Sequence, residues 1–129
     1  RLGLASLDGQ PDIPGATGYL AEEMVAGAVA ELLVGVRRDP VYGATLTLGL
    51  GGVTAELLAD TVTLVLPAEA EDVLAAMKWL RLWPLLDGYR GRPKADVASA
   101  AQIAARLGAL VLADETIEEI EINPLMLKP

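Results

Sequence analysis

The side chains best placed for chemistry lie near the C-terminus, where Glu119, Glu121 and Asn123 alternate with Ile120 and Ile122. In a β-strand successive side chains point to opposite faces, so a strand here would put the two carboxylates and the amide on one face. Like charges on one face repel, and a hard cation such as Mg²⁺, which prefers oxygen ligands, would relieve that repulsion. For this stretch alone an exposed acidic edge strand is the simpler interpretation, and metal binding by Glu121 and Asn123 is the second.

A second group of polar residues lies in the N-terminal half, around two glycine-containing segments. Glu23 and Glu31 lie on either side of a glycine turn, and a carboxylate beside a strand can accept hydrogen bonds from the paired hydroxyls of a ribose. Gly51 and Gly52 could present backbone N–H groups to a phosphate, although the lysine and the strand-to-helix context of a P-loop are absent. The ordinary alternatives are surface acids for the glutamates and a sheet-edge bulge for the glycines.

Arginines cluster twice next to glycine-containing turns. Arg37 and Arg38 end one predicted strand, and Arg90 and Arg92 lie in a basic, glycine-rich loop. Guanidinium groups bind phosphate oxygens well, but the same residues can simply form a solvated rim that offsets the acidity around them. The sequence leaves these two interpretations open.

The composition restricts the classes of protein that fit. The 129 residues suit one domain, the net charge of −8 argues against a nucleic-acid backbone as partner, and hydrophobic residues make up 53%. Neither Cys nor His occurs, which excludes disulfides, thiolate chemistry and a phosphohistidine in this chain. We find no signal peptide and no uninterrupted apolar span that could cross a bilayer, so we expect a cytoplasmic protein without a membrane partner.

The pattern of apolar residues predicts strands, then two helices, then a strand. Residues 1–18 carry several glycines and prolines and are expected to form a linker or flexible arm. We expect strands over residues 19–25, 29–38, 45–50, 53–58, 61–66 and 117–125, with the first two forming a hairpin. Residues 53–58 could also form a helical turn. Pro124 is expected to end the last strand, since proline removes a backbone donor.

The two helices should cover one face of the sheet. After Pro67 the stripe of Val73, Ala76, Met77 and Leu80 has helical spacing, and a second helix should run from a cap at Asp96 to about Asp114. Both tryptophans, Trp79 and Trp83, are expected to be packing anchors. The predicted fold is a two-layer α+β architecture with a mostly antiparallel sheet.

Five segments occur together in an order that resembles a known family. They are Glu22-Glu23-Met24-Val25 to Glu31-Leu32-Leu33-Val34-Gly35, Arg37-Arg38-Asp39-Pro40 with Gly43, Gly49-Leu50-Gly51-Gly52, Leu86-Asp87-Gly88-Tyr89-Arg90-Gly91-Arg92-Pro93 and Glu121-Ile122-Asn123-Pro124-Leu125. From Tyr19 to the end, the chain closely resembles the C-terminal part of the ATP-grasp domain of NDP-forming acyl-CoA synthetases. The wider relatives are the succinyl-CoA synthetase β subunits. Residues 19–129 would then be a partial ATP-grasp domain, its C-terminal subdomain.

The resemblance implies a role for each matching residue. Glu23, with the backbone around Met24 and Val25, matches the hinge that meets adenine, and Glu31 matches the acid that binds the ribose hydroxyls. Asn123 matches a metal ligand, and Glu121 the acid two residues earlier. Gly51 with Gly52, and Arg90 with Arg92, match family signatures for which we expect phosphate contact. ATP or ADP and Mg²⁺ are the implied cofactors.

The resemblance also implies a reaction that this chain cannot complete alone. The parent enzyme would convert a carboxylic acid, CoA and ATP into acyl-CoA, ADP and phosphate through a histidine on a separate CoA-binding or ligase domain. That histidine and the first half of the nucleotide site do not match any part of this chain, so we expect a piece that is inactive alone, with a homo-oligomer left open. The alternative is a regulatory or assembly module fused to a lysine acetyltransferase.

Overall fold

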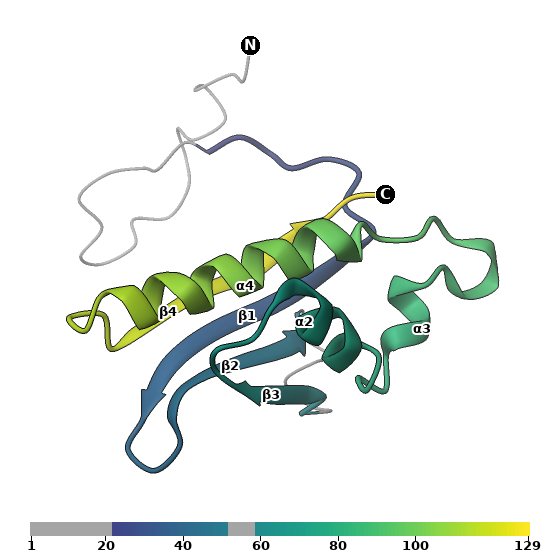
Figure 1. Cartoon of the computed structure of the whole chain (residues 1–129). Helices are drawn as coiled ribbons and strands as arrows, with labels where there is room; N and C mark the ends of the chain where they lie inside the picture. Colours follow the sequence, from purple (N-terminus) through teal and green to yellow (C-terminus); the bar gives the residue numbers. More distant parts are fainter. Residues whose placement is uncertain (1–21, 52–58) are drawn as a thin grey trace.

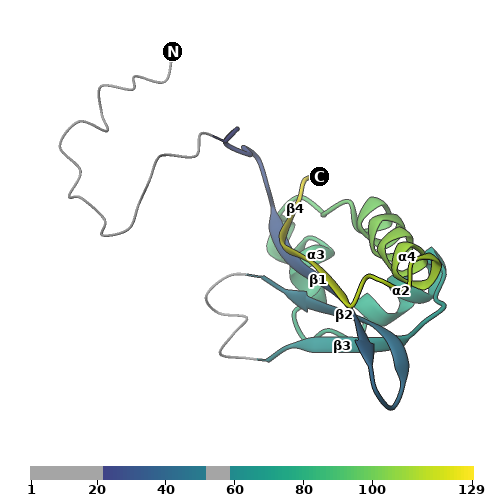
Figure 2. The ribbon, with the colours of Figure 1, turned by 90° about the vertical axis from the view of Figure 1, so that its left-hand side faces the viewer.

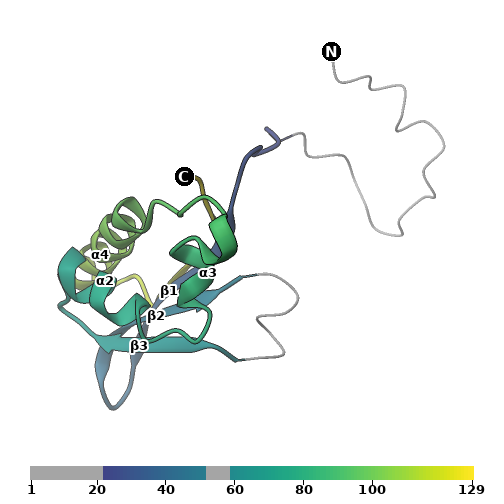
Figure 3. The same cartoon turned by 90° about the vertical axis from the view of Figure 1, so that its right-hand side faces the viewer.

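The computed structural model describes residues 22–51 and 59–129, which form a sheet covered by helices on one face (Figure 1). The elements are β1 (Ala30–Asp39), β2 (Gly43–Leu50), β3 (Thr61–Val65), α2 (Ala70–Met77), α3 (Trp83–Leu86), η2 (Tyr89–Gly91), α4 (Val97–Ala113) and β4 (Glu119–Leu127). The four-stranded sheet has the order β3-β2-β1-β4, and every pair is antiparallel. Figures 2 and 3 show α2 and α4 on the same side of this sheet, which confirms the predicted two-layer α+β fold.

The core lies between the sheet and the helices because one face of each central strand is apolar. In β1 every second residue, Leu32, Val34 and Val36, is fully buried, and Leu46 and Leu48 of β2 are equally inaccessible. Val34 pairs with Leu48 and Val36 with Leu46, so the two strands present these side chains to the same layer. The apolar residues that alternate along these strands therefore face the core, and the residues between them face the open side of the sheet.

The predicted hairpin between residues 19–25 and 29–38 is wrong. Residues 22–25 have no regular structure, and Met24 is 88% exposed. Both edges of β1 are occupied, one by β2 and the other by β4, so no edge remains for a preceding strand. Residues 19–21 and the whole of the strand predicted at 53–58 lie outside the described residues. The strands predicted at 29–38, 45–50 and 61–66 are confirmed as β1, β2 and β3.

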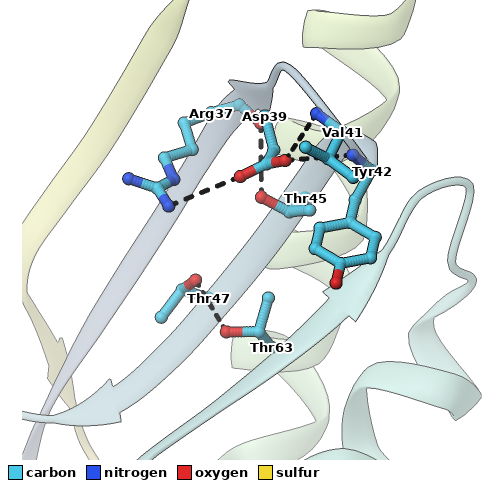
Figure 4. Close-up of polar contacts among 7 residues, drawn as sticks. All are labelled: Arg37, Asp39, Val41, Tyr42, Thr45, Thr47 and Thr63. Carbon is cyan, nitrogen blue, oxygen red and sulfur yellow. Dashed lines mark hydrogen bonds and ion pairs between the residues drawn. The ribbon is translucent and has the colours of Figure 1, made fainter.

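The turn between β1 and β2 is closed by an aspartate. The Asp39 carboxylate accepts hydrogen bonds from the backbone N–H of Val41 (2.8 Å) and Tyr42 (3.0 Å), and Arg37 reaches it at 3.7 Å (Figure 4). Asp, a proline and a glycine at this turn are the residues that favour it locally. This turn, rather than the one predicted around Gly27, makes the β1 hairpin.

Each long helix begins with an acidic cap. Before α2, the backbone N–H of Glu69 donates to the Asp72 carboxylate at 3.0 Å as one half of a capping box. Before α4, the Asp96 carboxylate accepts from the backbone N–H of Ser99 at 3.0 Å, which confirms the predicted cap. The predicted apolar stripes are buried at Val73, Ala76, Met77 and Leu80, and at Ala100, Ala101, Ala104 and Val111. Trp83 packs against the core, as expected of an anchor, but Trp79 is 83% exposed and does not anchor the fold.

Arg38 closes the other end of α4. Its guanidinium donates to the backbone carbonyls of Val111, Asp114 and Ile117, the last at 3.1 Å. Val111 lies in the last turn of α4 and Asp114 is its C-cap, and a cation is favoured at a helix C-terminus. Arg38 is therefore a structural residue on the helix-covered side, and its suggested phosphate contact is not available.

Two further differences concern the connections. The predicted basic loop at residues 84–93 contains the short helices α3 and η2, held by Asp60, a buried carboxylate that accepts from the backbone N–H of Arg81 and Leu82. Pro124 does not end the last strand, because β4 continues to Leu127. A register shift between Leu32 and Val34 accommodates the proline, as expected for a bulge in an edge strand. Within the described residues, no helix is long and apolar enough to span a membrane.

Three turn and cap carboxylates should make the stability depend on pH. Hydrogen bonds from the backbone of Tyr42 and Val41 lower the pKa of Asp39, those from Ser99 lower the pKa of Asp96, and those from the Thr116 side chain and backbone lower the pKa of Asp114, each from an ordinary value of 3.8. A carboxyl group whose pKa is lowered in the folded state contributes stability that is fully present above pH 3.8. This contribution is lost as the pH falls through the pKa of the folded state.

We therefore expect the urea midpoint to be steady above about pH 5 and to fall in more acidic solution. Replacing Asp39 by Asn should reduce the slope of this fall, because one of the three linked carboxyls is removed. An unchanged slope in the Asp39→Asn protein would contradict the linkage of that turn to stability.

Candidate functional site

The candidate site is the face of the sheet that the helices leave open. On β1 this face carries Glu31, Leu33, Gly35 and Arg37, because the residues between them point into the core. The neighbouring strands add the residues paired with this row: Gly49, Thr47 and Thr45 from β2, and Glu119 and Glu121 from β4. The row runs along the middle of the sheet, with polar side chains on either side.

A shallow depression of about 280 Å³ lies at the middle of this row. It is lined by Leu33, Gly35, Val36, Arg37, Thr47, Glu119 and Glu121. Gly35 has no side chain, and a Cβ placed there would lie 3.7 Å from the Glu121 carboxylate oxygen Oε2. The glycine therefore keeps the floor of the depression low, directly beside an acid.

The acidic face predicted for the last strand is confirmed in part. Glu119, Glu121 and Asn123 are all exposed, whereas Ile120 and Ile122 are partly buried against the core. Within the described residues Glu121 accepts no hydrogen bond and makes no ion pair, so its oxygens remain available. The described residues contain no group of three or more Asp or Glu that could hold a metal ion, so Glu121 and Asn123 could supply only part of a ligand set.

A second depression, of about 300 Å³, lies where β1 begins, between Glu31 and Gly51. The Gly51 N–H donates to the Glu31 carbonyl at 2.8 Å, and a Cβ on Gly51 would lie 3.1 Å from the Glu31 Cβ. The Gly51 N–H that was suggested to meet a phosphate is therefore already paired with the strand that carries Glu31. Gly52 lies outside the described residues.

The remaining predicted site residues are not brought to these depressions. Glu23, Met24 and Val25 are exposed in the segment before β1, and no described hydrogen bond joins them to Glu31. Arg90 and Arg92 are exposed in and after η2, whose neighbouring Leu86 is buried in the core on the helix-covered side. Arg90 has a left-handed backbone, with φ of 55°, and its guanidinium lies 5.3 Å from the centre of the Tyr89 ring.

Sequence reasoning missed four residues that line the central depression: Leu33, Gly35, Val36 and Thr47. Leu33 and Gly35 belong to the run quoted for the first acidic segment, but nothing in that run marks them as a floor. A glycine inside a strand pattern does suggest a close approach, and that signal was present at Gly35. Only the pairing of Gly35 with both Thr47 and Glu121 shows what approaches it.

Comparison with known proteins identifies the family of this chain. A family model described as an ATP-grasp domain matches residues 9–129. The chain is 37% identical over 95 residues to the β subunit of the ADP-forming acetate–CoA ligase I of Pyrococcus furiosus, covering 74% of this chain and 41% of that protein. It is 36% identical over 112 residues to a trans-feruloyl-CoA synthase of an unknown prokaryotic organism, covering 87% of this chain and 16% of that protein.

A solved structure shows the same fold. An acetyl-coenzyme A synthetase of Candidatus Korarchaeum cryptofilum aligns with a TM-score of 0.75 and 33% identity over 82% of this chain and 49% of that one. That protein was solved in complex with coenzyme A and Mg-AMPPCP, with its phosphohistidine segment pointing towards the nucleotide binding site. The chain thus spans less than half the length of these relatives. On the strength of the family model and of these relatives, the chain belongs to the ATP-grasp family of the ADP-forming acyl-CoA synthetases.

Proposed function

We propose that this chain supplies one wall of the ATP and Mg²⁺ site of an ADP-forming acyl-CoA synthetase. The complete enzyme would convert a carboxylic acid, CoA and ATP into acyl-CoA, ADP and phosphate. The observation that carries the proposal is the open sheet face, with one depression at Glu31 and another over Gly35 on the same strand. Glu31 and Gly35 are four strand positions apart, about 13 Å, which is enough to keep the ribose end of a nucleotide apart from its phosphate end.

The ribose end would lie at Glu31. An ionised carboxylate only accepts hydrogen bonds, and two ribose hydroxyls can donate to its two oxygens. Glu23, Met24 and Val25 would meet the adenine from the segment that leads into β1. Because this segment is exposed and makes no regular structure, it is free to close on a base placed beside Glu31.

The phosphate end would lie over Gly35, where a metal ion can reach Glu121 and Asn123. Carboxylate and amide oxygens are suitable Mg²⁺ ligands, and this ion usually keeps several waters and substrate phosphate oxygens in its shell. Two protein ligands are therefore a sufficient set. When bound, Mg²⁺ would neutralise charge that develops on the transferred phosphoryl group.

The other proposed phosphate contacts come from two directions. Gly52 would approach a phosphate from the end of β2, because the Gly51 N–H already donates to the Glu31 carbonyl. Arg90 and Arg92 lie off the open face, so they would contact a phosphate that a partner domain presents, not the one held over Gly35. The chain has no histidine, so a phosphohistidine would have to come from another domain, and the Korarchaeum relative was solved with a phosphohistidine segment that points towards its nucleotide binding site. The relatives named above are ligases or synthases, which gives no support to the acetyltransferase-fusion alternative.

The test is release of ADP by the complete protein that carries this chain. It would be incubated with ATP and Mg²⁺, and CoA and a panel of carboxylic acids would be added separately and together. ADP formation that requires both CoA and an acid is the expected result and would begin to identify the acid. Tight nucleotide binding without such turnover would contradict the ligase assignment.

A further inference from the structure

The outer edge of β3 is the feature of the molecule that the nucleotide site does not explain. β3 is the end strand of the sheet, and within residues 22–51 and 59–129 nothing pairs with its outer side. The Leu66 N–H donates to the Ala44 carbonyl of β2 at 2.9 Å. Because the backbone groups of an antiparallel strand alternate in direction, those of Leu64 also point to β2, and those of Thr63 and Val65 point outward. Thr63 is held in register by a 3.0 Å contact between its hydroxyl and that of Thr47 (Figure 4).

The two edges of the sheet differ in how they resist pairing. The β4 edge carries the exposed acids Glu119 and Glu121 and a bulge at Pro124, and such features discourage strand addition. The β3 edge, Thr-Val-Thr-Leu-Val, has no charge, no proline and no glycine. Two copies of a chain with a net charge of −8 repel each other, and the side chains of this edge add no like charge to that repulsion.

We propose that β3 is a homodimer interface, at which a second copy of this chain adds its own β3 in antiparallel orientation. With a twofold axis through Thr63, that residue faces its own copy and exchanges both backbone hydrogen bonds with it. Val62 then faces Leu64, both on the helix-covered side, and Thr61 faces Val65 on the open side. The strand is thus its own complement, as an isologous interface requires, and the sheet continues from one copy into the other.

The surface beside this edge is suited to the same contact. A groove of about 380 Å³ runs between β3 and α2, lined by Val62, Thr63, Leu64, Asp72, Ala75, Ala76 and Trp79. Trp79 is 83% exposed there, although an exposed indole is costly to keep in water and tryptophan is enriched in interfaces. Strands in a sheet lie about 4.8 Å apart, so the apolar side chains of a second β3 would come alongside this groove. The Trp79 ring would then be covered.

The test is sedimentation equilibrium of the chain over a range of concentration, with Thr63→Pro as the main variant. Proline at this position removes an outward N–H and the exposed hydroxyl contact with Thr47, but it leaves the backbone hydrogen bonds to β2 intact, so the fold is retained. The dimer dissociation constant should rise by about 30-fold or more, because two backbone hydrogen bonds are lost across the twofold axis. Thr63→Lys, which adds a charge at the edge, is the second variant and should act in the same direction. Circular dichroism would check that both variants are folded.

The matched control is Leu110→Lys, which adds the same charge at an exposed apolar position on α4, 47% accessible. Its dissociation constant should equal that of the unmodified chain. Trp83→Phe leaves Trp79 as the single tryptophan, and its emission should shift to the blue as the dimer forms, but not in Thr63→Pro. A monomer at every concentration, or a dimer that Thr63→Pro leaves unchanged, would overturn the proposal.

Discussion

Replacing Glu31 by alanine is expected to weaken ATP binding by about 10- to 100-fold in the complete protein, because a hydrogen bond to a charged group contributes about 1.5–3 kcal/mol. The carboxylate belongs to a half-buried residue on the open face, next to the depression that it lines with Gly51. Its removal would take away the proposed acceptor for the ribose hydroxyls, while β1 and its pairing to Gly51 remain. Isothermal titration calorimetry with ATP and Mg²⁺ would measure the change.

One further variant and one nucleotide analogue separate the ribose contact from a general effect of charge. Glu22→Ala removes an exposed carboxylate from the segment before β1 and should leave the affinity within about twofold of the original, as expected for a surface change. A 2′-deoxyribose nucleotide should bind the original protein more weakly but lose little further affinity in Glu31→Ala. Equal losses from deoxy substitution in both proteins would remove Glu31 from the ribose site.

The second large effect is expected at the proposed Mg²⁺ site. Glu121→Ala should raise the Mg²⁺ concentration required for half-maximal nucleotide binding by about tenfold or more, because an ionised oxygen ligand is lost beside Gly35. Asn123→Ala should act in the same direction but less strongly, since an amide oxygen carries no net charge. Both residues are exposed and support no part of the core, so the urea midpoint should stay near that of the unmodified protein.

The matched control for this site is Glu119→Ala. It removes the same carboxylate from the same face of β4, two residues away and opposite Arg37. Glu119 lies further from Asn123, so its removal should leave the Mg²⁺ requirement unchanged. If Glu119→Ala and Glu121→Ala shift the requirement equally, the effect is one of general charge and the ligand assignment fails.

Local pattern was enough to predict most of the elements. The alternation in β1 and in β4, the acidic first turn of α2, and the Asp96 cap of α4 each depend on residues close together in the chain. The alternation also predicted that Glu119, Glu121 and Asn123 would share the exposed face. These predictions hold because a side chain's direction within one strand or helix follows from its position in that element.

Two of the predictions that failed depended on a distant part of the chain, whereas the failure at Trp79 is local. Residues 22–25 have a strand-like composition, but β4, nearly a hundred positions later, takes the edge of β1 that they would need. Arg38 has the charge to bind phosphate, yet the carbonyls at the end of α4 occupy it. Trp79 follows a helix whose buried stripe does not include it.

The sequence by itself determined the alternation, the caps and the set of acids, glycines and arginines that resembles the ATP-grasp family, since these depend on neighbours along the chain. Only the tertiary structure decided which of them share a surface. It placed Glu31 and Gly51 around one depression and Glu121 over Gly35 in another, and it put Arg90 and Arg92 outside both. The reason is physical: strand pairing and burial are settled by contacts between residues far apart in sequence, which local pattern does not record.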